Sequence, residues 1–284
     1  MRFHEDQMAA LVCSDGVSRD IHIWQADGAK AVFIAIHGGM AHAGDYCTPA
    51  LYFKEKGITT VSYDMNGHDR KKKVFIPSFD VFLDDLVLFI EWTKQTFPDL
   101  PIFLMGHSMG ALILTHYGLR RVTELEPAIK GFIMSSPYYA NAIKLPGIVE
   151  SLSGVLSRFT PNLQVPVEDF TDFLTHDAEI TARHHADAAD DYRATAVSAR
   201  FGSELLKAQQ YLPDQMSRWN HPTIFFVAGD DKLSDAPECR RLIGLMNQEK
   251  LTTHYYPDNY HENFNETNRE EIFELIDTWV QERL

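Results

Sequence analysis

The sequence contains few cysteines and no long apolar run, and each absence excludes a class of protein. Among 284 residues the only cysteines are Cys13, Cys47 and Cys239, and no two of them form a CxxC pair. An odd and scattered set of this kind is typical neither of a disulfide framework nor of a zinc site. No stretch reaches the ~18 apolar residues of a membrane helix, and the N-terminus lacks the apolar segment of a signal peptide. We therefore expect a cytoplasmic protein with reduced thiols.

Basic residues are also in the minority. The chain has 26 Lys and Arg against 40 Asp and Glu, which gives a formal net charge of −14. Affinity for nucleic acid comes largely from cationic contacts with phosphates, so this charge argues against a nucleic-acid partner. Hydrophobic residues make up 45% of the chain. A chain of this size and composition can bury a core without disulfides.

Strand and helix signals alternate along most of the chain. Short apolar segments predict strands, and most of them are apolar at nearly every position, as in strands buried on both faces of a parallel sheet. The segment at 21–24 follows an Asp-Gly turn and is expected to be an edge strand. The predicted strands are residues 21–24, 31–36, 58–63, 102–105, 129–134, 223–228 and 252–256.

Between the strands, apolar residues spaced along one face predict helices. Ser78 is the expected cap of one helix, whose apolar face begins at Phe79. Residues 109–121 are predicted to form a second helix, and Thr267 with Glu270 forms a capping-box pattern ahead of the last one. Repeated alternation of strands and helices indicates a doubly wound, mostly parallel sheet.

One long segment breaks this alternation. Residues 137–212 show no strand pattern, so we expect a helical cap inserted between two parts of the core, residues 1–136 and 213–284. Within the cap, the segment from His184 to Asp191 is rich in His and Asp, but its Ala-rich helical setting favours a solvated helix over a metal site. An apolar stripe of the cap either packs on the core or forms an acyl-binding wall. The stripe consists of Leu145, Ile148, Val149, Leu152, Val155, Leu156 and Phe159.

Residues 106–110 read Gly-His-Ser-Met-Gly and fit the G-x-S-x-G pattern of a nucleophilic serine. The pattern lies between a predicted strand and a predicted helix, as this turn requires. A serine aimed out of such a sharp turn has a strained backbone. Side chains two residues away on either side would clash, which explains Gly106 and Gly110. The pattern predicts Ser108 as nucleophile, at a helix N-terminus that favours developing negative charge.

A nucleophile of this kind needs backbone N–H groups that stabilise the oxyanion of its intermediate. The N–H of Met109 is one candidate, because it follows the nucleophile directly. The second is expected in the loop His37-Gly38-Gly39-Met40, where glycines let a substrate approach the backbone closely. We place it at Gly39, with Met40 as the alternative, and expect His37 to support the loop.

The serine also needs a histidine base and an acid that orients it, in the chain order Ser, acid, His. Asp230 and Asp231 both follow the strand at 223–228, at the sheet edge where the serine lies, and Asp235 is a more remote candidate. His261 follows the last predicted strand in a loop that can reach this edge, whereas His254 lies within that strand. Position therefore favours His261 as the base.

Together these motifs resemble the branch of the α/β-hydrolase superfamily that contains monoacylglycerol lipases and lysophospholipases. The resemblance rests on four motifs that span nearly the whole chain: His37-Gly38-Gly39, the serine motif at 106–110, Gly229-Asp230-Asp231-Lys232-Leu233 and Tyr260-His261-Glu262. It implies the α/β-hydrolase fold and favours Asp231 as the acid of a triad with Ser108 and His261. It also implies ester hydrolysis through an acyl-enzyme without cofactor or metal, and a cap that forms an apolar acyl pocket.

Two loops depart from the pattern of this family. Its oxyanion loop often reads His-Gly-x-x-x-His, and His42 is one place late for that pattern. The loop after the strand at 58–63 usually contains Gly-x-Gly-x-Ser, where this chain has Asn66-Gly67-His68-Asp69-Arg70. These changes concern local loop geometry and leave the triad intact.

The sequence therefore predicts a serine carboxylic-ester hydrolase that acts on monoacyl lipid esters, either a monoacylglycerol lipase or a lysophospholipase. A short-chain carboxylesterase and a thioesterase use the same triad and stay open as alternatives. A non-catalytic binding protein of this fold is a further alternative, against which the intact triad argues. The expected partner is a small-molecule or lipid ester, and the apolar stripe of the cap would allow transient contact with a membrane surface.

Overall fold

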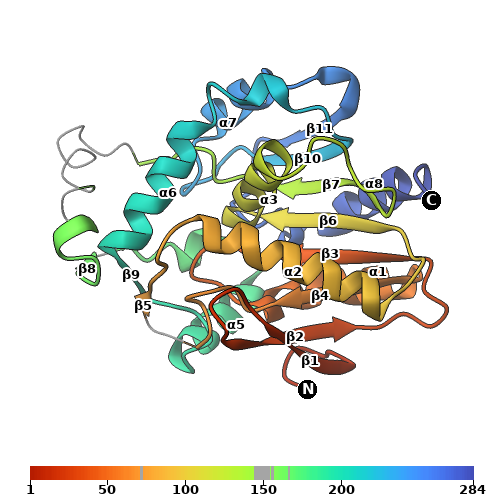
Figure 1. Ribbon diagram of the computed structural model, residues 1–284, viewed down its shortest axis with the longest axis horizontal. Coiled ribbons are helices and arrows are strands. Elements are labelled where there is room, and N and C mark those ends of the chain that lie inside the picture. The colour runs from red at the N-terminus through yellow and green to blue at the C-terminus, as the bar shows by residue number, and fades with distance from the viewer. Residues whose placement is uncertain (71–72, 144–153, 155–156, 166) are drawn as a thin grey trace.

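The structure is a computed structural model that describes residues 1–70, 73–143, 154, 157–165 and 167–284 (Figure 1). Its main sheet contains β1 (Gln7–Val12), β2 (Ser18–Trp24), β3 (Ala31–Ile36), β4 (Ile58–Tyr63), β6 (Ile102–His107), β7 (Ile129–Ser135), β10 (Thr223–Ala228) and β11 (Leu251–Tyr256). Their order across the sheet is β1-β2-β4-β3-β6-β7-β10-β11. β2 runs antiparallel to both of its neighbours, whereas every pair from β4 to β11 is parallel.

The central strands confirm the prediction of a mostly parallel sheet. β3, β4 and β10 are buried at every position, as strands covered on both faces must be. The prediction of an edge strand at 21–24 is wrong, because β1 pairs with β2 and becomes the edge itself. β1 escaped prediction because its apolar residues do not alternate with polar ones, and Met8 and Val12 are exposed.

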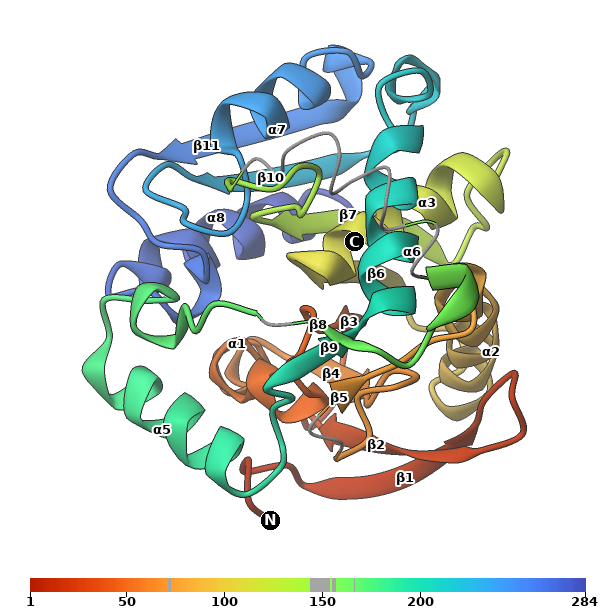
Figure 2. The same cartoon turned by 90° about the vertical axis from the view of Figure 1, so that its left-hand side faces the viewer.

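Helices cover both faces of the sheet (Figure 2). The residues of two buried apolar clusters correspond to these two layers. One layer contains α2 (Asp80–Thr96), α3 (Met109–Arg120) and α7 (Ala236–Ile243), and the other contains α1 (Cys47–Glu55) and α8 (Arg269–Gln281). Short 3₁₀ turns join the elements: η1 (Ala43–Tyr46), η3 (Met216–Arg218), η4 (Gln248–Lys250) and η5 (Asn263–Asn265). This is the doubly wound arrangement that the sequence predicts.

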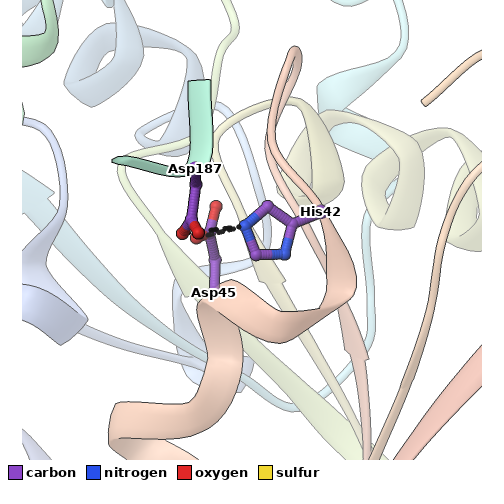
Figure 3. A group of neighbouring side chains, drawn as sticks. All are labelled: His42, Asp45 and Asp187. Atoms are coloured by element: carbon purple, nitrogen blue, oxygen red, sulfur yellow. Dashed lines mark hydrogen bonds and ion pairs between the residues drawn. The ribbon is translucent and has the colours of Figure 1, made fainter. Parts of the chain in front are cut away.

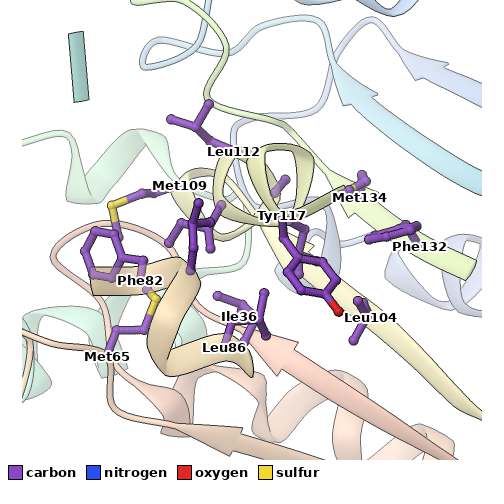
Figure 4. Close-up of a cluster of buried hydrophobic side chains, with 14 of the residues drawn as sticks. Ile36, Met65, Phe82, Leu86, Leu104, Met109, Leu112, Tyr117, Phe132 and Met134 are labelled. Atoms are coloured by element: carbon purple, nitrogen blue, oxygen red, sulfur yellow. The ribbon is translucent and has the colours of Figure 1, made fainter. Parts of the chain in front are cut away.

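Helix α3 is buried along almost its whole length, which fixes its position over the middle of the sheet. Figure 4 shows its Leu112 and Tyr117 among side chains of α2 and of the strands. Burying a large apolar side chain contributes about 1.5–3 kcal/mol, so this cluster is a major source of stability. The neighbours labelled in the figure include Ile36, Phe82, Leu86, Leu104, Phe132 and Met134.

Helix α2 begins differently from the sequence prediction. Its first residue is Asp80, and Phe79 occupies the N-cap position without a side-chain cap, so the expected cap at Ser78 is wrong. The N–H of Phe79 instead donates to the carboxylate of Glu204, at 3.1 Å. A side chain distant in sequence thus accepts the hydrogen bond of an N–H group at the start of the helix, where the neighbouring Ser78 was the expected acceptor.

Helix α8 also lacks its predicted capping box. Its N-cap residue is Asn268, which makes no side-chain cap, so the pattern of Thr267 and Glu270 misled the prediction. The side chain of Asn268 exchanges hydrogen bonds with that of Asn259, at 3.0 and 3.1 Å. This contact ties the start of α8 to the loop that follows β11.

We call residues 137–212 the cap; these limits remain a prediction. Described elements of the cap lie beyond the ends to which β6 and β7 point (Figure 1). They are β8 (Gln164–Val165), η2 (Thr171–Phe173), α5 (Ala178–Ala189), β9 (Ala196–Ser198) and α6 (Ala199–Tyr211). β8 and β9 form a small sheet with β5 (Lys73–Val74), so the expectation of a cap without strands is wrong. Strands of two or three residues are too short to show a period of two.

A very tight turn joins β6 to α3. An added Cβ at Gly106 would lie 2.8 Å from the backbone N of Ala111, and one at Gly110 would lie 1.9 Å from the carbonyl oxygen of Ile36. These distances are far below van der Waals contact. The two glycines therefore allow α3 to start directly against β3 and β6, which confirms the steric reason given for them.

We predict that Gly110→Ala lowers the free energy of unfolding by about 1–3 kcal/mol, because the methyl group pushes the start of α3 away from Ile36. Gly202→Ala is the matched control, since Gly202 lies inside α6 and an added Cβ meets nothing within 4 Å. That control should be neutral or gain up to about 1 kcal/mol. Thermal and urea unfolding measure both, and equal stability of the two variants would contradict the steric argument.

Candidate active site

Ser108 lies alone between β6 and α3 in a strained conformation. Its φ is +54° and its ψ is −118°, a region that side chains rarely adopt. The backbone around it is held on both sides: its N–H donates to the carbonyl of Ser135 at 2.9 Å, and its own carbonyl accepts from the N–H of Tyr138 at 3.1 Å. The strain therefore serves to present the hydroxyl at the edge of the sheet, and neighbouring strands maintain it.

The ring of His261 connects Ser108 with Asp231. His261 Nε2 lies 2.7 Å from Ser108 Oγ, and His261 Nδ1 lies 2.6 Å from Asp231 Oδ2. A carboxylate only accepts hydrogen bonds, so Nδ1 carries the proton and Nε2 is free to accept from the serine hydroxyl. All three side chains are buried. The structure thus brings together the three residues that the sequence predicts for the triad.

The environment of Asp231 keeps it ionised. Its second carboxylate oxygen accepts hydrogen bonds from the N–H groups of Leu233 and Ser234, at 2.8 and 2.9 Å. Burial alone would raise the pKa of Asp231, but the His261 ring and these two N–H groups hold it below its ordinary value. Asp231 is therefore a charged acceptor for the histidine at neutral pH.

The alternative acids and base lie away from this chain of hydrogen bonds. Asp230 is 47% exposed and pairs with Lys232. Asp235 caps α7 by accepting from the N–H of Glu238 at 2.9 Å. His254 lies in β11, where it stacks on Phe226. The geometry therefore separates Asp231 and His261 from the candidates that sequence position left open.

The predicted oxyanion loop lies beside the nucleophile. An added Cβ at Gly38 would come within 3.4 Å of Ser108 Cβ, and one at Gly39 within 3.6 Å of Met109 Sδ. Met40 has a positive φ of +62°, which turns the chain away after Gly39. Because Met109 is the first residue of α3, its N–H has no partner within the helix. Gly39 and Met109 thus lie close to Ser108, and their role as oxyanion donors remains a prediction.

The side chain of His37 supports this loop through two hydrogen bonds. Its Nδ1–H donates to the carbonyl of Gly38 at 2.7 Å, and its Nε2 accepts from the N–H of Met65 at 3.1 Å. Burial lowers the pKa of His37 well below its ordinary value, which fixes the neutral form that these two bonds require. His107 is likewise kept neutral, because burial and the nearby His261 ring lower its pKa to about 3.

A cavity of about 230 Å³ opens at Ser108 and His261 and extends between the core and the cap. Its apolar lining includes Met40, Val167, Phe170, Leu174, Leu233 and Phe264. Its charged lining includes Asp45, Glu168, Asp169, Arg193 and Glu262. The guanidinium of Arg193 pairs with Asp45 at 2.6 Å. Among the described lining residues, no Lys or second Arg is present to receive an anionic group.

Close to this cavity, three side chains converge that could offer ligand atoms to a metal (Figure 3). The Nε2 of His42 lies 3.2 Å from Asp45 and 3.3 Å from Asp187. Each carboxylate also pairs with a guanidinium, Asp45 with Arg193 and Asp187 with Arg2 at 2.8 Å. Because two arginines already neutralise the two carboxylates, the group is an ion-pair cluster and not a typical cation site.

The expectation of a solvated helix from His184 to Asp191 is wrong for its inner face. His184 and Asp187 are fully buried, because both turn toward the core from α5. The ring of His184 donates through Nε2 to Glu262 at 2.8 Å and accepts through Nδ1 from Arg193 at 2.9 Å. Sequence analysis missed Asp45, Arg193 and Glu262 in this cluster. Glu262 had been noted only as the neighbour of His261, and His42 only as a displaced family residue.

The predicted apolar stripe of the cap falls almost entirely outside the described residues. Its last member, Phe159, is described and is 76% exposed. Within the described ranges, no helix has the length and apolar character needed to cross a bilayer.

Comparison with known proteins agrees with this fold. Residues 27–268 match the family described as serine aminopeptidase, S33. The chain is 30% identical to phospholipase YtpA of Bacillus subtilis over 253 residues, 88% of this chain and 95% of that protein. It is 25% identical to the monoacylglycerol lipase of Mycolicibacterium smegmatis over 273 residues, 95% of each. The crystal structure of Paleococcus ferrophilus monoacylglycerol lipase superimposes with a TM-score of 0.80 at 21% identity, covering 94% of this chain and all of that one (100%).

The fold and the matches define an α/β hydrolase. The chain belongs to the serine aminopeptidase, S33 family, whose model covers most of its length. The prediction of an α/β-hydrolase enzyme is therefore confirmed.

We predict that Asp187→Asn destabilises the protein by about 1–3 kcal/mol at pH 7, because a buried carboxylate between two cationic or hydrogen-bonding partners is lost. Burial alone would raise the pKa of Asp187, but His42 and Arg2 lower it below its ordinary value. A depressed carboxyl pKa stabilises the folded state above about pH 4, and this contribution is lost as the pH falls further. The difference from wild type should therefore shrink between pH 7 and pH 3.

Urea unfolding at several pH values measures this difference. Asp214→Asn is the matched control, since it removes the same charge from an exposed position. A destabilisation that is equal at pH 7 and pH 3, or no larger than that of the control, would contradict the account of the cluster.

Proposed function

We propose that the protein hydrolyses monoacyl lipid esters, monoacylglycerols above all, by a serine mechanism through an acyl-enzyme. The observation that carries the serine mechanism is the series of hydrogen bonds from Ser108 through His261 to Asp231, with lengths of 2.7 and 2.6 Å. Ser108 and His261 line the cavity, together with residues of the cap such as Phe170 and Leu174.

The proposed first step is attack of Ser108 Oγ on the ester carbonyl carbon. A serine hydroxyl is a weak nucleophile, and His261 Nε2 takes its proton as the new C–O bond forms. Asp231 keeps the ring in the tautomer that can accept this proton and stabilises the imidazolium that results. The 2.7 Å distance between Nε2 and Oγ supports this role, because the proton transfer needs no rearrangement of the ring.

The negative charge of the tetrahedral intermediate forms on the former carbonyl oxygen. The N–H groups of Gly39 and Met109 are the proposed donors to this oxygen, and each typically contributes about 3 kcal/mol to transition-state stabilisation. His261 then gives its proton to the leaving alcohol as the C–O bond breaks. Water attacks the acyl-enzyme by the same route and releases the carboxylic acid.

Two observations support a neutral monoacyl lipid as substrate. The cavity combines apolar side chains, among them Phe170, Leu174 and Phe264, with a charged part that is mostly acidic. Arg193 is the one Lys or Arg among the described lining residues, and it pairs with Asp45, so these residues offer no free cation to an alcohol part that carries phosphate. A glycerol ester suits this lining better than a lysophospholipid. One of the two relatives is named a monoacylglycerol lipase and the other a phospholipase.

The described surface of the cap exposes several large apolar side chains, which supports the further proposal of transient contact with lipid aggregates. They are Phe159, Leu163, Val167 and Phe173. Co-sedimentation with phosphatidylcholine vesicles checks this contact, and complete absence of the protein from the vesicle pellet would contradict it.

We predict that Ser108→Ala lowers the release of fatty acid from monooleoylglycerol by about 10⁴-fold or more, because the nucleophile is lost. Ser217→Ala removes an exposed hydroxyl and serves as the control, with activity equal to wild type. Activity of Ser108→Ala at the level of this control would contradict the serine mechanism.

The same assay extended to lysophosphatidylcholine, acetyl and octanoyl esters and an aminoacyl anilide tests the substrate class. The expected order places monooleoylglycerol first. A profile that peaks at acetyl esters and falls to nothing with longer acyl chains would favour a short-chain esterase.

A second prediction distinguishes the two adjacent carboxylates. Asp231→Asn should lower kcat by about 10⁴-fold, because the amide favours the wrong tautomer of His261. Asp230→Asn should change kcat by less than about threefold, since Asp230 points to solvent and pairs with Lys232. Steady-state kinetics of both variants provide the comparison, and similar kcat values for the two would contradict the assignment of the acid.

A further inference from the structure

Arg193 occupies a central place between the cap and the two loops of the proposed active site. It follows α5 in the chain, and its side chain is 11% exposed at the wall of the cavity. Its Nη1 donates to Asp45 at 2.6 Å and to His184 Nδ1 at 2.9 Å. Its Nη2 lies 3.6 Å from the carboxylate of Glu262. One guanidinium thus connects three separate segments of the chain.

Glu262 links this guanidinium to the proposed base, because it follows His261 directly. Its backbone N–H donates to the carbonyl of Leu174 in the cap at 2.8 Å. One carboxylate oxygen accepts from His184 Nε2 at 2.8 Å and from the side chain of Asn265 at 2.7 Å, and the other faces Arg193. These contacts restrain the position of Glu262 and, through the backbone, that of His261.

The same segment also holds the proposed oxyanion loop. The N–H of Ala194 donates to the carbonyl of Met40 at 2.9 Å. Met40 follows Gly39, and Asp45 lies in η1 a few residues further on. Residues 193 and 194 therefore fix this loop at two points, through one backbone bond and one ion pair.

The charges in this cluster depend on one another. Burial alone would raise the pKa of Glu262, but His184 and Arg193 hold it well below its ordinary value. The pKa of Asp45 is also lowered, against the effect of burial, by Arg193, His42 and His184. Without the guanidinium, two buried carboxylates would lack their cation. Because an unpaired buried charge is costly, the carboxylates would then move toward solvent or become protonated.

We propose that Arg193 is a positioning residue for the reaction: by binding Asp45 and Glu262 at once, it sets the spacing between the oxyanion loop and the His261 loop. This inference rests on the proposed function, because it assigns Arg193 an effect on the step that Ser108 and His261 carry out. Arg193 acts through its two carboxylate partners. A displacement of about 1 Å between catalytic groups can lower a rate by about 100-fold.

Arg193→Met and Arg193→Lys test this role in steady-state hydrolysis of monooleoylglycerol. Arg193→Met should lower kcat by about 10–100-fold and change KM by less than about threefold, because geometry and not substrate binding is affected. Arg193→Lys should recover part of kcat, since an ammonium can pair with one of the two carboxylates. Arg183→Met is the matched control: Arg183 is another partly buried arginine that crosses from α5 to the core, where it contacts Cys47 at 2.9 Å.

A double variant distinguishes positioning from a general loss of stability. If Arg193 acts through Glu262, the double variant Arg193→Met with Glu262→Gln should have a kcat close to that of Arg193→Met alone. Equal kcat for Arg193→Met and Arg183→Met, an effect on KM alone, or fully multiplicative losses in the double variant would overturn the inference. All variants are compared well below their Tm values.

The controls separate this inference from the proposed function. If Ser108→Ala abolishes hydrolysis while Arg193→Met retains wild-type kcat, only the positioning role fails. If Ser108→Ala itself retains activity, the proposed function fails, whatever the result at Arg193.

Discussion

The hydrogen bond between His261 Nε2 and Ser108 Oγ depends on loops from distant parts of the chain meeting at one edge of the sheet. Ser108 follows β6, Asp231 follows β10 and His261 follows β11. These strands are parallel members of one sheet, so all three loops leave it at the same edge. The fold therefore brings the three side chains to the same region, and the conformations of the loops determine their final distances.

Two kinds of contact provide this final adjustment. Close packing acts on the serine side, where Gly110 lies directly against the carbonyl of Ile36 and any larger residue would displace α3. Electrostatics act on the histidine side, where the cluster of Asp45, Arg193 and Glu262 joins the loops to the cap. Buried charges of this kind are costly unless they are paired, so the cluster tolerates few arrangements of the loops. The cap thereby contributes to the geometry of the site as well as to its enclosure.

Much of the fold could be predicted from local sequence. Strands buried on both faces are rich in apolar and β-branched residues, and this made β3, β4 and β10 visible with their correct bounds. The triad residues could be predicted for a related reason, because each lies in the loop directly after a strand. A local pattern such as Gly-x-Ser-x-Gly therefore also indicates where in the fold its serine lies. The choice between Asp230 and Asp231, in contrast, came from family resemblance; in the structure Asp231 is buried and contacts His261, whereas Asp230 is exposed and pairs with Lys232.

What local sequence could not reveal depends on contacts between distant residues. The start of α2 is satisfied by Glu204, more than a hundred residues away, so the cap expected at Ser78 was not needed. The charged face of α5 was expected to be solvated, because a helix rich in His and Asp usually is. Its burial follows from partners at Arg2, Asp45 and Glu262, which no local pattern connects to it.

The most direct measurement of the central claim is the site and rate of covalent labelling by a fluorophosphonate. The reagent reacts with a serine hydroxyl only where a base activates it. The account predicts a single phosphonylated peptide that contains Ser108, and labelling that His261→Ala slows by orders of magnitude in a folded protein. Labelling of a different residue, or an unchanged rate in the His261 variant, would contradict it.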